Sequence, residues 1–203
     1  MKILLTGFEP FGGDKRNPSW EAVEGVTHVP AGVTVVKKRL PVVFYRAADE
    51  LMETIRAERP DAVISVGLAG GRQAVTVERI AVNLADGRIP DNAGQQPCDE
   101  TLYDAGENAY FATLPIRKIV SAMQAAGIPA AISNSAGLYV CNNVMYAALF
   151  LAAAQGRGMR AGFIHLPYLP EQAKDGAPSL SLADDIRALE AAVACTADII
   201  SRN

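Results

Sequence analysis

Short apolar runs alternate with segments of helical spacing, and this alternation is the feature that most limits how the chain can fold. Apolar and β-branched runs predict strands at residues 2–6, 33–40, 61–66, 130–133 and 160–166. Periodicity, caps and stop signals predict helices at residues 18–26, 43–59, 114–126, 142–155 and 182–201. Strands that alternate with helices favour an α/β fold, with a mostly parallel sheet covered on both faces.

Two segments are less regular. Residues 75–82 predict a further strand, in which the change of phase at Glu78 and Arg79 indicates a bulge. Residues 85–112 are polar and rich in turn signals, so we expect them to form the longest loop, and such loops are often functional. The sequence has no linker, internal repeat or low-complexity segment, and we therefore expect residues 1–203 to form a single domain.

The composition indicates a globular protein without a polyanionic partner. Half of the 203 residues are hydrophobic, a fifth are charged, and the net charge is −3. Because no cluster of Lys and Arg occurs, we expect neither nucleic acid nor an anionic membrane as a partner. The first apolar stretch is too short for a signal peptide, and no later run approaches the length of a membrane span.

Cysteine and histidine usage argues against disulfides and metals. The three cysteines are widely spaced and form neither a disulfide framework nor a zinc pattern. Only two histidines, His28 and His165, are present, which makes a metal site built on imidazole a poor interpretation. We expect a reducing, cytoplasmic compartment, with no metal and no cofactor.

Cys141 directly precedes the predicted helix at 142–155. A cysteine at a helix N-terminus faces unpaired backbone N–H groups and the positive end of the helix dipole. Both stabilise a thiolate, so we expect its pKa to lie below the free value of about 8.5. Cys141 is therefore the candidate nucleophile, although a buried cysteine is more often a small core residue.

His165 and Glu78 are the candidates to activate Cys141. In open α/β sheets, ligands bind at the carboxyl ends of strands. His165 lies near the end of the strand at 160–166 and Cys141 follows the strand at 130–133, so strand ends would bring them together. Glu78 could orient the imidazole in the correct tautomer. The alternatives are a satisfied core histidine and a solvated glutamate on an edge strand.

The other cysteines, the other histidine and the glycine-rich tracts give less evidence of a function. Cys98 and Cys195 are interpreted as incidental, and His28 as solvated. The glycine-rich tracts at 7–13 and 67–72 lack Walker A and dinucleotide-binding spacing. The second tract could bind phosphate through backbone amides, but that hypothesis leaves the cysteine at the helix start unexplained.

Seven tracts, in order, give the chain a specific resemblance over nearly its whole length. They are 6–13 (TGFEPFGG), 17–22 (NPSWEA), 69–72 (AGGR), 78–83 (ERIAVN), 88–92 (RIPDN), 139–142 (YVCN) and 165–170 (HLPYLP). The chain resembles type I pyroglutamyl peptidase, or pyrrolidone-carboxylate peptidase, a family of cysteine exopeptidases. The resemblance implies an α/β/α sandwich and a cytoplasmic, metal-free enzyme without cofactor, commonly a homotetramer, that acts on pyroglutamyl peptides.

The resemblance also implies roles for catalytic residues. Cys141 would be the nucleophile, His165 the base and Glu78 the residue that orients His165. Arg88, with the backbone N–H of Cys141, would stabilise the oxyanion. The acyl-enzyme would then be hydrolysed by water.

The substrate pocket is implied in the same way. Phe8 and Phe11 would sandwich the pyrrolidone ring, Asn17 would help to shape the pocket, and Ile89 and Val140 would line it. Taken on the residues alone, the two phenylalanines are by default core residues, and two rings in a glycine-rich loop are also suited to clamp a flat ligand.

Three positions depart from the family's usual pattern. Leu68 stands where many members have Gln, Leu138 where many have Thr, and Gly87 where many have Ala. We expect activity, with changed substrate affinity and a looser loop at Gly87. Two other hypotheses are a thiol amidase for another small acyl group and an inactive ligand-binding homologue.

Overall fold

The central sheet of the computed structural model, which describes residues 1–156 and 158–202, has six strands in the order β2-β1-β3-β8-β4-β7. Their bounds are Thr34–Leu40 (β2), Lys2–Phe8 (β1), Ala62–Leu68 (β3), Arg160–Leu166 (β8), Val75–Glu78 (β4) and Ala130–Ser133 (β7). The first four run parallel, β4 is antiparallel to β8, and β7 is parallel to β4. The predicted, mostly parallel sheet is confirmed.

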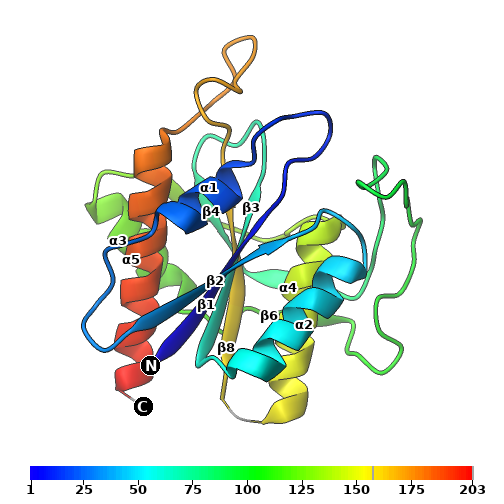
Figure 1. The fold of residues 1–203 in the computed structure, drawn as a ribbon, viewed down its shortest axis with the longest axis horizontal. Helices are drawn as coiled ribbons and strands as arrows, with labels where there is room; N and C mark the ends of the chain where they lie inside the picture. Colours follow the sequence, from blue (N-terminus) through cyan, green and yellow to red (C-terminus); the bar gives the residue numbers. More distant parts are fainter. Residues whose placement is uncertain (157, 203) are drawn as a thin grey trace.

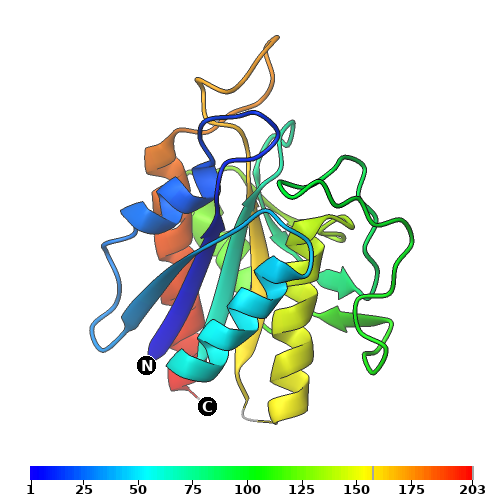
Figure 2. The same cartoon turned by 45° about the vertical axis from the view of Figure 1, so that its right-hand side comes forward.

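Helices cover both faces of this sheet (Figures 1 and 2). One face carries α1 (Pro18–Gly25), α3 (Ile116–Ala125) and α5 (Leu182–Ser201), and the other carries α2 (Arg46–Glu58) and α4 (Val140–Gln155). Alternate residues of the strands enter the two cores, as Leu5 and Ile64 pack with α1 and α5 while Leu4 and Val63 pack with α2 and α4. Burial on both faces explains why the central strands β1, β3 and β8 are largely apolar, whereas the edge strand β2 carries Lys37, Lys38 and Arg39.

The predicted helix starts at Asn17 and Ser181 are confirmed. Asn17 Oδ1 accepts from the backbone N–H of Ser19 at 3.1 Å, and Pro18 occupies the first helical position. Ser181 Oγ accepts from the backbone N–H of Asp184 at 3.1 Å. The prediction for α2 was three residues too early, because Tyr45 has a φ of 62° and the helix begins only after it.

The predicted bulge at Glu78 and Arg79 is wrong, because the chain changes sheets there. β4 ends at Glu78, and β5 (Ile80–Val82) pairs instead with β6 (Ala109–Phe111) in a separate antiparallel sheet. The second strand, β6, lies inside the predicted long loop. The side chain of Asn83 anchors the rest of the loop. It accepts from the backbone N–H of Tyr103 at 2.9 Å and donates to the Tyr103 carbonyl at 2.8 Å.

None of the helices in the described part of the chain combines the length and the apolar character that a membrane crossing requires.

Candidate active site

A cavity of about 530 Å³ lies where β1, β3 and β8 end. Its walls include Phe8 at the end of β1, Leu68 at the end of β3 and His165 near the end of β8, together with Cys141 from α4. Carboxyl ends of parallel strands are the usual binding edge of an α/β sheet. The structure therefore brings the two candidate reactive side chains to one cavity.

Cys141 lies in the first turn of α4, over a glycine of the sheet. A Cβ added to Gly67 would meet Cys141 Sγ at 3.0 Å and the ring of Phe163 at 2.8 Å. Since Gly67 pairs with His165 across β3 and β8, the thiol and the imidazole sit over neighbouring strands. The prediction that the ends of the strands at 130–133 and 160–166 bring Cys141 and His165 together is wrong, because β7 runs opposite to β8. Residues 134–139 instead lead from the end of β7 to α4, which carries Cys141.

Glu78 contacts the histidine directly. His165 Nδ1 lies 2.7 Å from Glu78 Oε1, and the two residues are 3% and 0% exposed. The contact follows from strand register, since Thr76 pairs with His165 and Glu78 lies on the same face of β4 two residues on. With a carboxylate as acceptor, Nδ1 carries the proton and Nε2 is left free to accept one.

Burial is the largest single influence on the pKa of each of the three groups, but at Glu78 its partners outweigh it. Burial lowers the pKa of His165 against the opposing effect of Glu78, so the imidazole is neutral at pH 7. Burial alone would raise the pKa of Glu78, but His165, Ser133 and Arg72, in that order of effect, hold it below its usual value. Burial and the Glu78 charge raise the pKa of the Cys141 thiol to about 12. The predicted thiolate is therefore wrong, since burial outweighs the helix N-terminus, and the resting pair is a thiol and a neutral imidazole.

The other predicted pocket residues all line the same cavity, namely Phe8, Phe11, Asn17, Arg88, Ile89 and Val140. Phe8 is buried and Phe11 half-buried, with the Phe11 ring centroid 6.4 Å from that of Tyr139. The Asn17 amide is engaged in the loop itself, since it donates to the Glu9 carbonyl at 2.8 Å. Arg88 and Ile89 are exposed at the rim.

Comparisons with known proteins agree on one family. The model of the pyroglutamyl peptidase family matches residues 1–199. The chain belongs to the pyroglutamyl peptidase family. Pyrrolidone-carboxylate peptidase from Levilactobacillus brevis is 52% identical over 195 residues, which cover 95% of this chain and 96% of that protein.

Solved structures of the pyroglutamyl peptidase family share the fold. Pyroglutamyl peptidase I from Bacillus amyloliquefaciens superposes with a TM-score of 0.92 at 45% identity, covering 97% of both chains. Pyrrolidone carboxyl peptidase from Thermococcus litoralis gives a TM-score of 0.94 at 42% identity, covering 99% of this chain and 95% of that one.

The departures from the pyroglutamyl peptidase pattern lie at the cavity. Leu68 and Leu138 are half-buried and line it, so they present apolar surface. Gly87 is buried, its N–H donates to the Pro97 carbonyl at 2.8 Å, and its carbonyl accepts from Gln96 Nε2 at 2.9 Å. The looser loop stays a prediction, and these two hydrogen bonds anchor Gly87 to Gln96 and Pro97.

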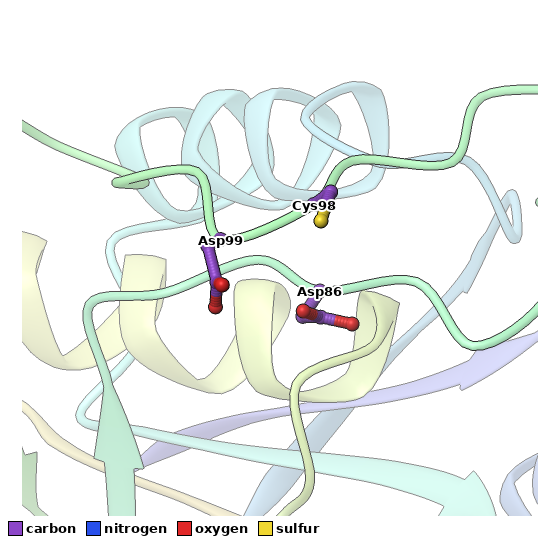
Figure 3. A group of neighbouring side chains, drawn as sticks. All are labelled: Asp86, Cys98 and Asp99. Carbon is purple, nitrogen blue, oxygen red and sulfur yellow. The ribbon is translucent and has the colours of Figure 1, made fainter.

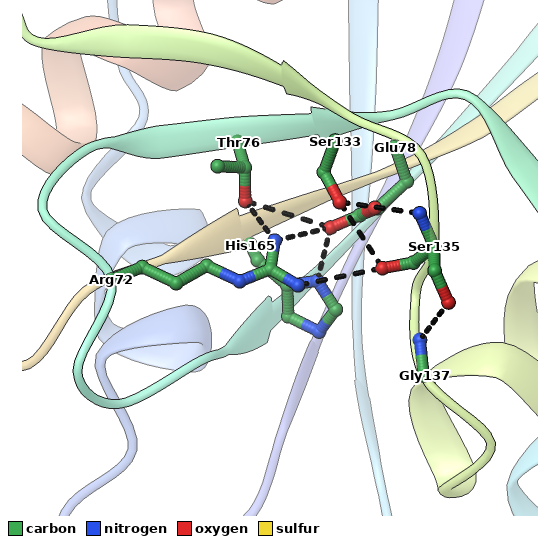
Figure 4. A network of polar contacts seen from close by, with 7 residues as sticks. All are labelled: Arg72, Thr76, Glu78, Ser133, Ser135, Gly137 and His165. Atoms are coloured by element: carbon green, nitrogen blue, oxygen red, sulfur yellow. Dashed lines mark hydrogen bonds and ion pairs between the residues drawn. The ribbon is translucent and has the colours of Figure 1, made fainter.

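Arg72 is the residue of the site that sequence reasoning missed. Arg72 Nη1 lies 2.6 Å from Glu78 Oε1 (Figure 4). The tract at 67–72 was interpreted as a possible phosphate loop, whereas the structure uses it as the turn between β3 and β4. The available signal was a cation that lies six residues before Glu78, the glutamate predicted to orient the catalytic histidine.

Three potential metal ligands lie together on the long loop (Figure 3). One ligand atom each of Asp86, Cys98 and Asp99 falls within 4.8 Å of the others. Asp86 is half-buried and the other two residues are exposed. Exposed groups of this kind are common without an ion, so we assign this one no metal function.

Proposed function

We propose that this protein is a cysteine exopeptidase that hydrolyses the amide bond after an N-terminal pyroglutamyl residue of peptides. The observation that carries the proposal is that His165, which is hydrogen-bonded to Glu78, lines one cavity with Cys141 in a chain of the pyroglutamyl peptidase family. The residue roles below are part of this proposal.

The cavity suits a neutral, flat acyl group. Pyroglutamate is a lactam without a free α-amino group, so its pocket needs no counter-ion there. Phe8, Phe11, Ile89 and Val140 offer apolar and aromatic surface of the kind that binds such a ring. The loop that Asn17 holds lines the same cavity.

Acylation begins with a proton transfer, because the resting cysteine is a thiol. His165 Nε2 takes the thiol proton as Sγ attacks the carbonyl carbon, and the carbonyl π electrons move to oxygen. Arg88 and the backbone N–H of Cys141, which has no helical partner in the first turn, stabilise that oxyanion. Such donors are worth about 3 kcal/mol each.

Collapse of the tetrahedral intermediate breaks the C–N bond. The His165 imidazolium gives its proton to the leaving amine, which departs as the shortened peptide. Water then attacks the thioester while His165 Nε2 accepts a water proton, and that proton finally returns to Sγ as free pyroglutamate leaves. Throughout, Glu78 holds Nδ1 and stabilises the imidazolium.

The test is hydrolysis of a fluorogenic pyroglutamyl amide under reducing conditions. We expect turnover by the wild type and a loss of at least about 10³-fold in Cys141→Ala, because the nucleophile is gone. Cys98→Ala, which removes an exposed cysteine, is the matched control and should keep full activity. Substantial turnover by folded Cys141→Ala would contradict the assigned nucleophile.

A second candidate is a thiol amidase for a different small acyl group. The apolar Leu68 and Leu138 at the cavity are the observation in its favour. A panel of acyl amides with different acyl rings decides between the two, since faster turnover of another acyl group would select this candidate. Tight binding of pyroglutamate without turnover would instead indicate an inactive homologue.

We further propose one catalytic domain, residues 1–203, that works in the cytoplasm as a homo-oligomer, a tetramer by family resemblance. The three cysteines are unpaired, which fits a reducing compartment. Light scattering coupled to size-exclusion chromatography measures the mass of the assembly, and a monomer of 21.5 kDa would exclude the tetramer.

A further inference from the structure

Arg72 connects the cavity with the His165–Glu78 pair. Its side chain lines the cavity, and its guanidinium donates to Glu78 Oε1, to Thr76 Oγ1 and, at 3.4 Å, to the Ser135 carbonyl. Figure 4 shows the guanidinium and the imidazole directed at the same carboxylate. The side chain that faces the substrate space therefore also contacts the group behind the histidine.

The backbone fixes this position. Gly71 has a φ of +85°, and the Arg72 N–H donates to the Ala69 carbonyl at 3.3 Å, which makes a tight turn after β3. Gly70 packs against the Tyr168 ring so closely that a Cβ there would lie 2.1 Å from a ring carbon. After the turn, β4 runs back along β8, which brings Glu78 to the guanidinium.

The imidazole and the guanidinium contact the same oxygen of Glu78, which also accepts from Thr76 Oγ1 at 3.5 Å. His165 Nδ1 lies 2.7 Å and Arg72 Nη1 lies 2.6 Å from Oε1, while the glutamate has no exposed surface. A buried carboxylate stays ionised only where a cation or strong donors compensate it. Because the imidazole is neutral at pH 7, Arg72 is the cation in contact with Glu78 among the described residues.

We infer that Arg72 is a positioning residue, which keeps Glu78 ionised so that Glu78 holds His165 with the proton on Nδ1 and with Nε2 free for the thiol. The kinetic part of this inference rests on the proposed function. Without the guanidinium, Glu78 protonates more readily, and a protonated carboxyl donates to Nδ1 and selects the wrong tautomer. The charged or titrating groups around Glu78 are Arg72 from the β3–β4 turn, His165 from β8 and Cys141 from α4.

The first test reads the tautomer directly and needs no turnover. The chain has only two histidines, so nitrogen NMR of isotope-labelled histidine resolves His165, with the exposed His28 as internal reference. We expect the Nδ1-protonated form in the wild type and in Arg72→Lys at pH 7, and its loss in Arg72→Gln. An unchanged tautomer in Arg72→Gln would overturn the inference even if the proposed substrate proves wrong.

The second test is a double-mutant cycle with Glu78→Gln. Provided that the wild type turns over a pyroglutamyl amide, Arg72→Gln should lower kcat by at least about tenfold with KM little changed, and should move the acid limb of kcat to higher pH. In the Glu78→Gln background, Arg72→Gln should change kcat by less than about twofold, because Arg72 acts through Glu78. Fully additive effects, or a raised KM with unchanged kcat, would contradict the inference.

Two further variants separate positioning from folding. Arg79→Gln is the matched control, since Arg79 lies next to Glu78 in sequence but bonds Asn134 at 2.8 Å, and it should leave tautomer and kcat unchanged. If Arg72→Gln does not fold, the tautomer of His165 in Arg72→Lys tests the inference instead. Lysine keeps the charge, so a folded Arg72→Lys protein must keep the wild-type tautomer, and the other tautomer would overturn the inference.

Discussion

Glu78 and Asp185 are two carboxyl groups without exposed surface, one at the end of β4, behind His165, and one in the first turn of α5. Glu78 contacts a guanidinium and an imidazole, and its pKa lies below the usual value. Neither oxygen of Asp185 has a hydrogen-bond partner, and burial together with the nearby Asp184 raises its pKa to about 8.

The two carboxyls are equally removed from water, so burial alone does not decide their charge. The partners of each carboxyl decide its charge, because a cation stabilises the ionised form, whereas a carboxyl without a partner in an apolar setting keeps its proton. Glu78 is therefore suited to hold an imidazole, and Asp185 behaves at neutral pH as a neutral core residue. The predictions below test this contrast with one amide substitution at each position.

The largest expected difference is in turnover. Glu78→Gln removes the charge that fixes the His165 tautomer, and we expect kcat to fall by about 10³-fold or more, as for carboxylates in comparable triads. Asp185→Asn keeps the shape of a neutral group that does not line the cavity, and it should leave kcat within about twofold. Steady-state kinetics on a pyroglutamyl amide measures both, and similar losses in the two variants would break the comparison.

The next difference is in how stability depends on pH. Between about pH 4 and about pH 8, Asp185 keeps its proton in the folded protein and loses it in the unfolded chain, so its contribution to stability is lost as pH rises. Asp185→Asn removes this pH-dependent contribution. The free energy of unfolding of the variant, relative to that of the wild type, should therefore rise by a few kcal/mol as pH increases over this range. Denaturant unfolding at several pH values measures it, and parallel curves would disprove it.

Glu78 should show the opposite sign. Its pKa is lowered in the folded protein, so its contribution is present above the ordinary value near 4.5 and is lost as pH falls. In the same unfolding series, Glu78→Gln should therefore lose stability relative to wild type toward neutral pH and approach it in acid. A slope like that of Asp185→Asn would contradict the assigned charge.

The smallest expected difference is in the reactivity of the thiol. The Glu78 charge is one cause of the raised pKa of Cys141, after burial, so Glu78→Gln should lower that pKa. Iodoacetamide should then alkylate Cys141 several-fold faster at pH 8, while Asp185→Asn should have no effect. Mass spectrometry of the Cys141 peptide gives the rate, with the exposed Cys98 as internal reference. An unchanged or slower rate in Glu78→Gln would exclude this coupling.

Most of the fold followed from local patterns, and the exceptions are non-local. The order of strands and helices, and the caps at Asn17 and Ser181, depend on neighbouring residues and were predicted. The switch of sheets at Arg79 and the short strand β6 depend on which distant segments pair, which phase and composition do not encode. The antiparallel direction of β4 is a fact of the same kind.

The site divides in the same way. Motifs identified Cys141, His165 and Glu78, and the structure places Glu78 against His165 and His165 in one cavity with Cys141. The pKa of Cys141 was predicted with the wrong sign, because the helix start is visible in the sequence while the burial that outweighs it is a product of packing. Arg72 was missed because only the return of β4 brings it to Glu78.

Gly67 couples the sheet to the nucleophile. Because Gly67 has no side chain, the sulfur of Cys141 can pack against the strand at this position. A Cβ there would lie 3.0 Å from Sγ and 2.8 Å from Phe163. A glycine inside a strand normally weakens the strand. Here the strand loses side-chain packing at Gly67, and the thiol of Cys141 packs over that position instead. Any variant library that aims to reshape the pocket must therefore treat positions 67 and 141 as one unit, because a single methyl group at the first competes for the volume of the second.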